Sequence, residues 1–201
     1  GTLATTTTTG TFTPSAMLTP GTLYRVAVTA ALADGLAATP FSSTFTTAAA
    51  VSIFPASLRP TSSTTTGSPV TVGVRFRSTV AYSITGIRFY LPANVTSTYT
   101  VSLWSSTGVK LATATGSPTS TTAGWRTVNL ATPVQITANT TYVASVRALT
   151  ASYSSSPLSF RLSYTNGTFT VPSLGGTSAS TDVFPTASST TNYFVDVVAA
   201  R

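Results

Sequence analysis

The stretch YSITGIRFYLPANVTSTYTVSLW, residues 82–104, decides the fold class of this chain. Up to residue 91 apolar residues alternate with Arg88 and Tyr90, and after a Pro-Ala-Asn break at 92–94 the same period returns in TVSLW. A period of two is expected of β-strands that bury one face. The stretch therefore predicts two half-buried strands joined by a turn, and an all-β protein.

The composition agrees with a sheet protein that meets water through hydroxyl groups. Of the 201 residues, 42% are hydrophobic and only 6% are charged. Ser and Thr make up roughly a third of the chain, and Thr is β-branched and favours strands. The scarcity of Lys and Glu, the absence of His and Cys, and the abundance of Thr, Ser and Ala favour an extracellular location, at the cell surface or secreted.

Further alternating runs follow on both sides of the opening stretch. Apolar residues alternate over 70–77, and Asn166-Gly167 is a strong hairpin signal. Between residues 52 and 198 we expect eight to ten strands, including separate strands over 124–128 and 132–137, with a loop over 61–68. Such spacing predicts a jelly-roll-like antiparallel β-sandwich over 52–201.

The first 48 residues predict about four strands, the last of which holds Phe41 and Phe45. The order of Thr11-Phe12-Thr13-Pro14, a Pro-Gly turn, the strand to Val28 and Phe45-Thr46-Thr47 resembles the C-terminal half of bacterial Ig-like domains. The turn Ala33-Asp34-Gly35 departs from that resemblance, because the family usually has a longer loop. We therefore expect residues 1–48 to be an incomplete Ig-like domain, joined to the sandwich by a linker over 49–51.

A four-stranded piece buries too little to fold alone, since an Ig-like sandwich needs about seven strands. Its apolar side chains would each forgo roughly 1.5–3 kcal/mol by staying in water. We expect them to contact an absent part of the polypeptide, the second domain or a neighbouring subunit. These subunit-contact candidates are Phe12, Tyr24, Val26, Val28, Phe41 and Phe45.

Residues 52–198 resemble a domain family of unknown function that recurs in secreted bacterial proteins, often beside Ig-like domains. The blocks that carry the resemblance occur in order: Phe54-Pro55, Gly86-Ile87-Arg88-Phe89-Tyr90, Ser102-Leu103-Trp104, Leu111-Ala112-Thr113-Ala114-Thr115, Gly124-Trp125, Thr141-Tyr142-Val143-Ala144-Ser145 and Asn192-Tyr193-Phe194-Val195-Asp196-Val197-Val198. Where the family often has a His-Tyr pair, this chain has Ser152-Tyr153, so a residue suited to a ligand or metal is missing.

The formal charge of +7 comes from cations scattered singly along the chain. They form no run of the kind that follows a nucleic-acid backbone, so we expect no nucleic-acid partner. Arg75 and Arg77 should share the outer face of their strand, with Arg88 near them if the next strand pairs as a hairpin. That arrangement would be a small basic patch for an anionic polymer, or simply three solvated charges. No apolar run is long enough for a membrane span.

The sequence favours a non-enzymatic protein without a cofactor. It lacks His and Cys, the usual bases, nucleophiles and soft metal ligands, and its three carboxylates, Asp34, Asp182 and Asp196, are far apart. A glycosidase would need two of them to converge, and a strong calcium site would need several. We therefore expect no catalytic residues and no metal site.

Aromatic rings and sequons supply the remaining candidate sites. Flat rings stack on sugars, and the carbohydrate-stacking candidates are Tyr90, Trp125, Tyr153 and Tyr164; the alternative for Trp104 and Trp125 is a place in the core. Glycosylation sequons begin at Asn94, Asn139 and Asn166.

Two functions follow as expectations. The first is a structural module of a cell-surface protein that self-associates into an oligomer or filament by strand complementation or edge pairing of the incomplete Ig-like half. The alternative is a carbohydrate-binding, adhesive module that anchors a larger secreted protein to polysaccharide. Fold class alone does not choose between them.

Overall fold

The structure is a computed structural model that describes residues 1–6, 9–16, 18–28, 40–148 and 152–201. The chain divides into two compact units, an N-terminal unit of Gly1–Ala50 and a C-terminal unit of Val51–Arg201. All regular structure in the described residues is β-strand, which confirms the all-β prediction.

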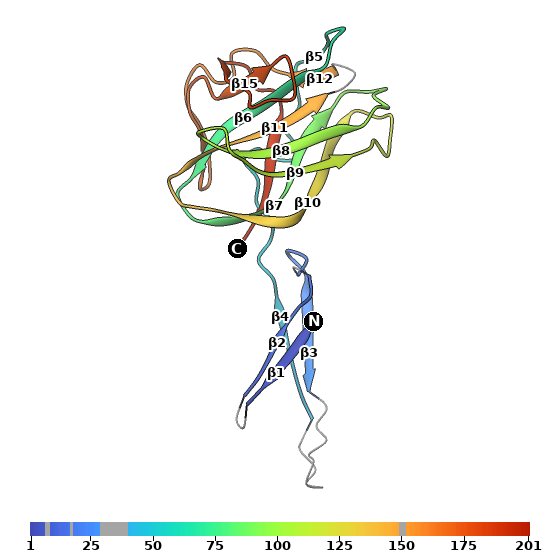
Figure 1. Cartoon of the computed structure of the whole chain (residues 1–201), viewed down its shortest axis with the longest axis vertical. Coiled ribbons are helices and arrows are strands. Elements are labelled where there is room, and N and C mark those ends of the chain that lie inside the picture. Colours follow the sequence, from blue (N-terminus) through green and yellow to red (C-terminus); the bar gives the residue numbers. More distant parts are fainter. Residues whose placement is uncertain (7–8, 17, 29–39, 149–151) are drawn as a thin grey trace. The chain divides into compact units, whose positions relative to one another are not determined.

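The C-terminal unit is a β-sandwich of two antiparallel sheets (Figure 1). The smaller sheet has three strands in the order β10 (Gly124–Ile136), β7 (Tyr82–Leu91), β17 (Val195–Ala200). The larger sheet has the order β13 (Tyr164–Asn166), β14 (Phe169–Val171), β6 (Val70–Ser78), β11 (Thr141–Ala148), β8 (Tyr99–Ser105), β9 (Lys110–Gly116), with β15 (Gly176–Ala179) also on β6 and β16 (Ala187–Ser189) on β15. A separate ribbon pairs β5 (Ser62–Thr65) with β12 (Ser152–Ser155).

The core lies between the two sheets, where alternate residues of each strand point inward. Ile87 and Phe89 on β7 and Val74 and Val101 on the larger sheet are all buried. The two layers meet directly where the ring of Phe89 lies edge-on to that of Tyr99, with centroids 4.5 Å apart. The period of two in residues 82–104 thus arises because β7 and β8 each bury one face, on opposite sides of the same core.

β6 and β7 do not pair as a hairpin, which was the condition for a basic patch that includes Arg88. These consecutive strands lie in different sheets, because the chain crosses from one layer to the other after Ser78. Arg88 on β7 therefore does not join Arg75 and Arg77 on β6 in a basic patch. Pairing partners are chosen by long-range packing, which the alternation within a strand does not encode.

Of the remaining predictions about strands and turns, two need correction and one is confirmed. The two strands expected over 124–128 and 132–137 are one strand, β10, with an irregularity between Asn129 and Val134. The expected loop over 61–68 contains β5. The hairpin predicted at Asn166-Gly167 is present as β13–β14, and Gly167 has the positive φ of 57° that its turn requires.

The N-terminal unit consists of two separate two-stranded sheets. One pairs β1 (Thr2–Thr5) with β2 (Gly10–Thr13), and the other pairs β3 (Leu23–Val28) with β4 (Phe41–Thr46). Between β1 and β2 the Thr6 N–H donates to the Thr9 carbonyl at 2.7 Å. The Ala33-Asp34-Gly35 turn lies outside the described residues. None of the described residues of this unit is buried.

Candidate functional site

The outer face of the three-stranded sheet gathers two of the four carbohydrate-stacking candidates. Tyr90 on β7 lies directly opposite Trp125 on β10, with ring centroids 5.7 Å apart and planes at 76°. Phe194 contacts both rings. Because the rings of Tyr90 and Trp125 are nearly perpendicular, they do not form one flat platform for a sugar.

Trp125 is engaged by the protein itself. It is half-buried, and its Nε1–H donates to the carbonyl of Leu58 at 3.3 Å. The guanidinium of Arg88 lies 4.6 Å from its ring centroid in a cation–π contact. The other tryptophan, Trp104, is buried under Phe184 and donates to Ser145 Oγ at 2.8 Å.

Beside Trp125, a buried ion pair fastens the first residues of the C-terminal unit to the sheet. Asp196 Oδ2 accepts from Arg88 Nε at 2.9 Å and Nη2 at 2.7 Å. The same carboxylate accepts the backbone N–H groups of Ile53 (2.8 Å) and Phe54 (3.1 Å), and Arg88 donates to the Phe54 carbonyl. Asp196 is 0% exposed. The pair is thus a structural clasp whose carboxylate is closed to a substrate.

Burial governs the shifted pKa values of this unit. It raises the pKa of Asp196 above 3.8, the effect of desolvation outweighing Arg88 and the two amides that favour the charged form. Burial likewise raises the pKa of the Tyr99 and Tyr164 hydroxyls. A carboxyl enclosed in this way is not placed to act as a general base on a bound ligand.

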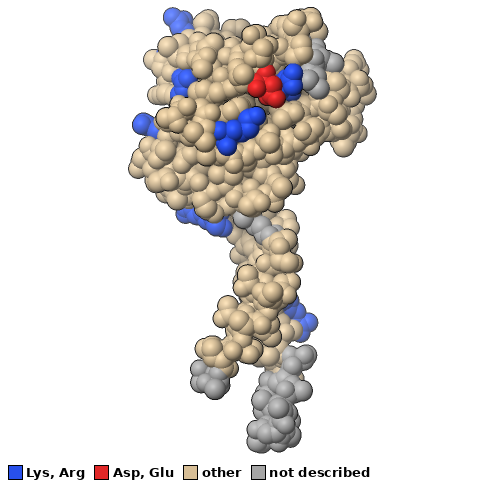
Figure 2. Space-filling view, viewed as in Figure 1, with Lys and Arg blue, Asp and Glu red and all other residues tan. Residues whose placement is uncertain are grey.

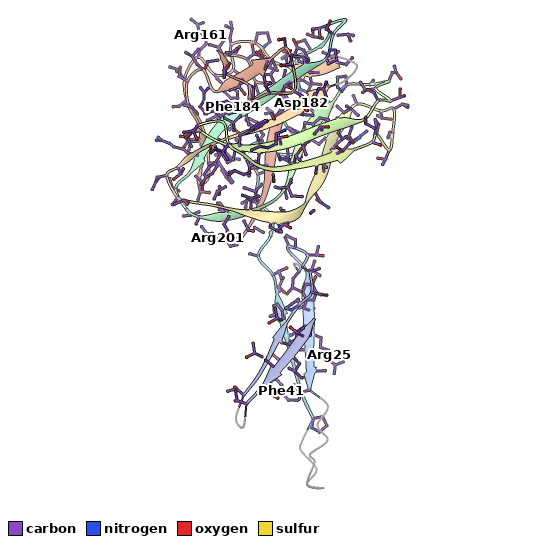
Figure 3. All side chains as sticks on the ribbon, viewed as in Figure 1. Arg25, Phe41, Arg161, Asp182, Phe184 and Arg201 are labelled. Atoms are coloured by element: carbon purple, nitrogen blue, oxygen red, sulfur yellow. The ribbon has the colours of Figure 1, made fainter. Side chains whose placement is uncertain are left out.

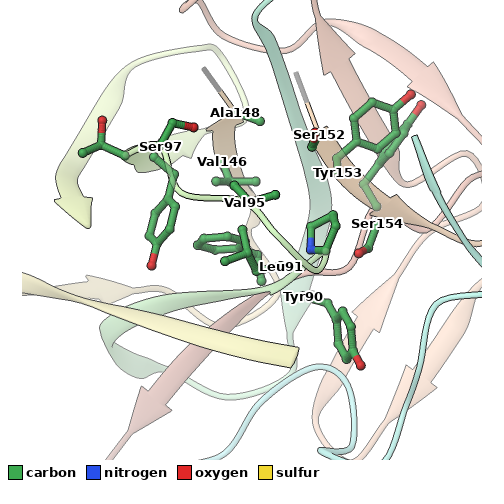
Figure 4. Close-up of a pocket in the computed structure, with 14 residues that line it drawn as sticks. Tyr90, Leu91, Val95, Ser97, Val146, Ala148, Ser152, Tyr153 and Ser154 are labelled. Atoms are coloured by element: carbon green, nitrogen blue, oxygen red, sulfur yellow. The ribbon is translucent and has the colours of Figure 1, made fainter. Parts of the chain in front are cut away.

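The other two aromatic candidates lie in different places. Tyr153 on β12 contacts Tyr193, with planes at 70°, and borders the same small cavity as Tyr90 (Figure 4). Tyr164 on β13 packs against Phe54, with centroids 5.5 Å apart, and does not border that cavity. The four predicted residues are therefore not one row of rings.

A groove lies next to this cavity. It shares Tyr90, Pro92 and Ser154 with the cavity. Most of its remaining lining comes from residues 59–63, which run into β5. The remaining lining residues are Arg59, Pro60, Thr61, Ser62, Ser63, Ala93 and Ala123. The groove thus presents one aromatic ring, one guanidinium and several hydroxyls, which are groups suited to holding a polar ligand.

Two residues of this groove were missed by the sequence analysis. Arg59 lies in an irregular segment with no periodic signal, and Ser154 is one of many serines. Ser154 is only 2% exposed, and its hydroxyl has no hydrogen-bond partner in the described part of the chain. Nothing in the local sequence separates Ser154 from its neighbours, because its role depends on the pairing of β12 with β5.

The three sequon asparagines differ in how free their side chains are. Asn94 and Asn139 are exposed turn residues with positive φ of 61° and 59°. Asn166 is also exposed, but its Nδ2 donates to the carbonyl of Ile53 at 3.1 Å. A glycan on Asn166 would compete with that hydrogen bond, whereas the side chains of Asn94 and Asn139 make no hydrogen bond to the described residues.

The subunit-contact candidates lie on exposed faces of the N-terminal unit. Phe12 is 62% and Phe41 61% exposed, and Phe41 projects from its strand in Figure 3. On the β3–β4 hairpin the register places five of the six candidates on one face: Tyr24, Val26, Val28, Phe41 and Phe45. Leu3 and Leu23, which are not among the candidates, are also exposed.

Little of the described surface carries charge or metal-binding chemistry. Most of the face in Figure 2 is formed by uncharged residues. No group of three or more His, Cys, Asp and Glu that could hold a metal ion occurs among the described residues. Within the same residues, no helix is long and apolar enough to cross a membrane.

Comparison with known families matches residues 56–195 to one described as a domain of unknown function (DUF4082). No curated protein matches the chain.

Proposed function

Because the chain belongs to the DUF4082 family, whose function is unknown, we propose from its geometry that it is a non-enzymatic, extracellular structural module that self-associates through its N-terminal unit. The observation that carries the proposal is the absence of any buried residue in the described part of Gly1–Ala50. We further propose that residues 1–48 are the C-terminal half of an Ig-like domain, and that a second copy of the chain supplies the missing layer.

The β3–β4 hairpin has the pattern of a sheet that needs a second layer. Tyr24, Val26 and Val28 share one face of the hairpin with Phe41 and Phe45, while Arg25 and Ala27 point to the other. An amphipathic sheet is stable when its apolar face packs against another layer. Burying each large side chain contributes roughly 1.5–3 kcal/mol of stabilisation. A second copy that covers this face would bury several of these side chains, and association would be favoured by their sum.

Open strand edges offer a second means of contact between copies. Each of the four strands pairs with a single partner among the described residues, which leaves one backbone edge of each strand unpaired. Proteins usually protect such edges with charged side chains. Arg25 is the single charged side chain in the described part of this unit, so little electrostatic repulsion opposes edge pairing.

A pair of neighbouring substitutions tests the proposal on the full chain. Val26→Lys places a charge in the apolar face, whereas Ala27→Lys places the same charge on the opposite face of the same strand. We expect sedimentation analysis to show oligomers for the unsubstituted chain and for Ala27→Lys, and monomers for Val26→Lys. Equal masses for all three proteins would contradict an interface on this face.

The groove supports carbohydrate binding as a second candidate function. Tyr90, Arg59 and the Ser154 hydroxyl converge on one hollow, and aromatic rings with hydroxyl and guanidinium donors are suited to sugars. Binding to a panel of glycans that is lost on Tyr90→Ala, but kept on Tyr164→Ala, would support this candidate. Glycan binding that survives Tyr90→Ala would place the site elsewhere.

A further inference from the structure

We propose that the groove at Arg59 binds the carboxylate of an acidic sugar, a uronic acid residue of a polysaccharide. This inference rests on the carbohydrate-binding candidate and narrows its ligand class. It does not depend on self-association of the N-terminal unit.

The guanidinium of Arg59 is held in place by the protein. Its Nη1 donates to the carbonyls of Ala56, at 2.6 Å, and Leu58, at 3.1 Å, and its Cζ lies 5.7 Å from the ring centroid of Tyr90. The side chain is exposed although it is anchored at three points. An anchored arginine loses less conformational entropy on binding than a mobile one.

The anchoring leaves one edge of that guanidinium for a ligand. Nη1 donates both of its hydrogen bonds to the two carbonyls. Nε and Nη2 have no hydrogen-bond partner among the described residues. A guanidinium edge matches the two oxygens of a carboxylate in a bidentate hydrogen-bonded pair. The arrangement thus favours a planar carboxylate over a neutral hydroxyl at this position.

The rest of the groove supplies partners for sugar hydroxyls. The Ser154 hydroxyl is almost buried and unpartnered in the described part of the chain, and the Tyr90 hydroxyl likewise makes no hydrogen bond there. Unpaired polar groups in such positions gain from a ligand that completes their hydrogen bonds. Both residues line the groove together with Arg59.

The positive charge of Arg59 is not neutralised within the groove. Among the residues that the structure describes, no Asp or Glu lines it. Asp196 is buried in its pair with Arg88, and Asp182 lies 3.7 Å from Arg147. A carboxylate ligand would therefore meet no competing anion of the protein, and it would be attracted by a chain whose formal charge is +7.

The test uses the full chain and calorimetric titration with trisaccharides of galacturonate, mannuronate and guluronate, and with their methyl esters. The ester keeps the sugar and removes the charge. We expect at least one acid to bind, and its ester to bind about 10- to 100-fold more weakly, as expected for the loss of a charge-assisted hydrogen-bonded pair. Arg59→Gln should weaken binding of the acid to a similar degree.

Arg161→Gln is the matched control, because Arg161 is exposed and does not line the groove (Figure 3). An equal loss in Arg161→Gln would reveal non-specific attraction and overturn the inference. Equal binding of acid and ester, lost on Tyr90→Ala, would overturn it while leaving the broader carbohydrate candidate in place. No binding of any of the three acids would also overturn it. None of these results bears on self-association, which the sedimentation experiment measures.

Discussion

The two units carry the same sequence pattern with opposite outcomes. In the C-terminal unit Val72, Val74 and Phe76 alternate along β6, and each is at most 1% exposed. In the N-terminal unit Val26 and Val28 alternate along β3 and are about half exposed. Alternation predicts that a strand has an apolar face, but burial of that face requires a second layer. The C-terminal unit has its second layer within the chain, and the N-terminal unit does not have one among the described residues.

The comparison predicts unequal costs for removing a phenylalanine from each unit. Phe76→Ala leaves a cavity in the sandwich and should lower the free energy of unfolding of the C-terminal unit by about 3–5 kcal/mol. Phe41→Ala removes an exposed ring and should change the same transition by less than about 0.5 kcal/mol. Denaturant unfolding followed by tryptophan fluorescence reports on this unit alone, because Trp104 and Trp125 both lie in it. Equal changes in the free energy of unfolding for Phe76→Ala and Phe41→Ala would contradict the proposed difference between the two units.

Breaking the ion pair between Asp196 and Arg88 should lower the free energy of unfolding nearly as much as Phe76→Ala. Asp196→Asn leaves the Arg88 guanidinium partly buried without its counter-charge, so we expect the free energy of unfolding to fall by about 3–5 kcal/mol. Asp182→Asn is the matched control, since its pair with Arg147 is partly exposed and worth at most about 1 kcal/mol. A similar small change for both variants would show that the buried pair is not a structural element.

Two glycines of the C-terminal unit differ in the space around them: Gly73 is tightly packed and Gly67 is open to solvent. A Cβ at Gly73 on β6 would lie 2.4 Å from the Ala144 carbonyl oxygen, whereas a Cβ at Gly67 would meet no atom within 4 Å. We expect Gly73→Ala to cost about 1–3 kcal/mol through overpacking. Gly67→Ala should stay within about 0.5 kcal/mol of the unsubstituted chain. Thermal unfolding of both variants, measured side by side, checks the difference.

The smallest expected effect is a dependence of stability on pH. Burial raises the folded-state pKa of Asp196 above its ordinary value of 3.8, so the folded state binds this proton at higher pH than the unfolded state. The free energy of unfolding should therefore fall as pH rises through the interval between the two values. Asp196→Asn should abolish this slope. A rise in stability over that interval would show that the hydrogen bonds to Asp196 outweigh its burial.

Local patterns predicted most strands because alternation and turn residues act within a few positions. Residues 82–104 and the Asn166-Gly167 turn are examples in which the local sequence suffices. The prediction failed where the outcome depends on distant partners. Arg88 would lie near Arg75 only if their strands paired as a hairpin; it pairs instead with Asp196, which lies 108 residues further along the chain.

The candidate site was predicted only in part. Tyr90 and Trp125 were selected as exposed rings, and they do lie together, but at right angles and in contact with arginines. Arg59 and Ser154 gave no signal, since their positions result from an irregular segment and from the β5–β12 pairing. Whether a hydroxyl is left unpaired in a groove is a property of tertiary structure.

The most direct test of the central claim is the mass of the full chain in solution as a function of concentration. If a second copy completes the N-terminal unit, the mass should rise from 20.5 kDa to multiples of that value, and Val26→Lys should return it to the monomer. A constant mass of 20.5 kDa at all concentrations would contradict the account. In that case the apolar face of β3 and β4 is not an interface between copies of this chain.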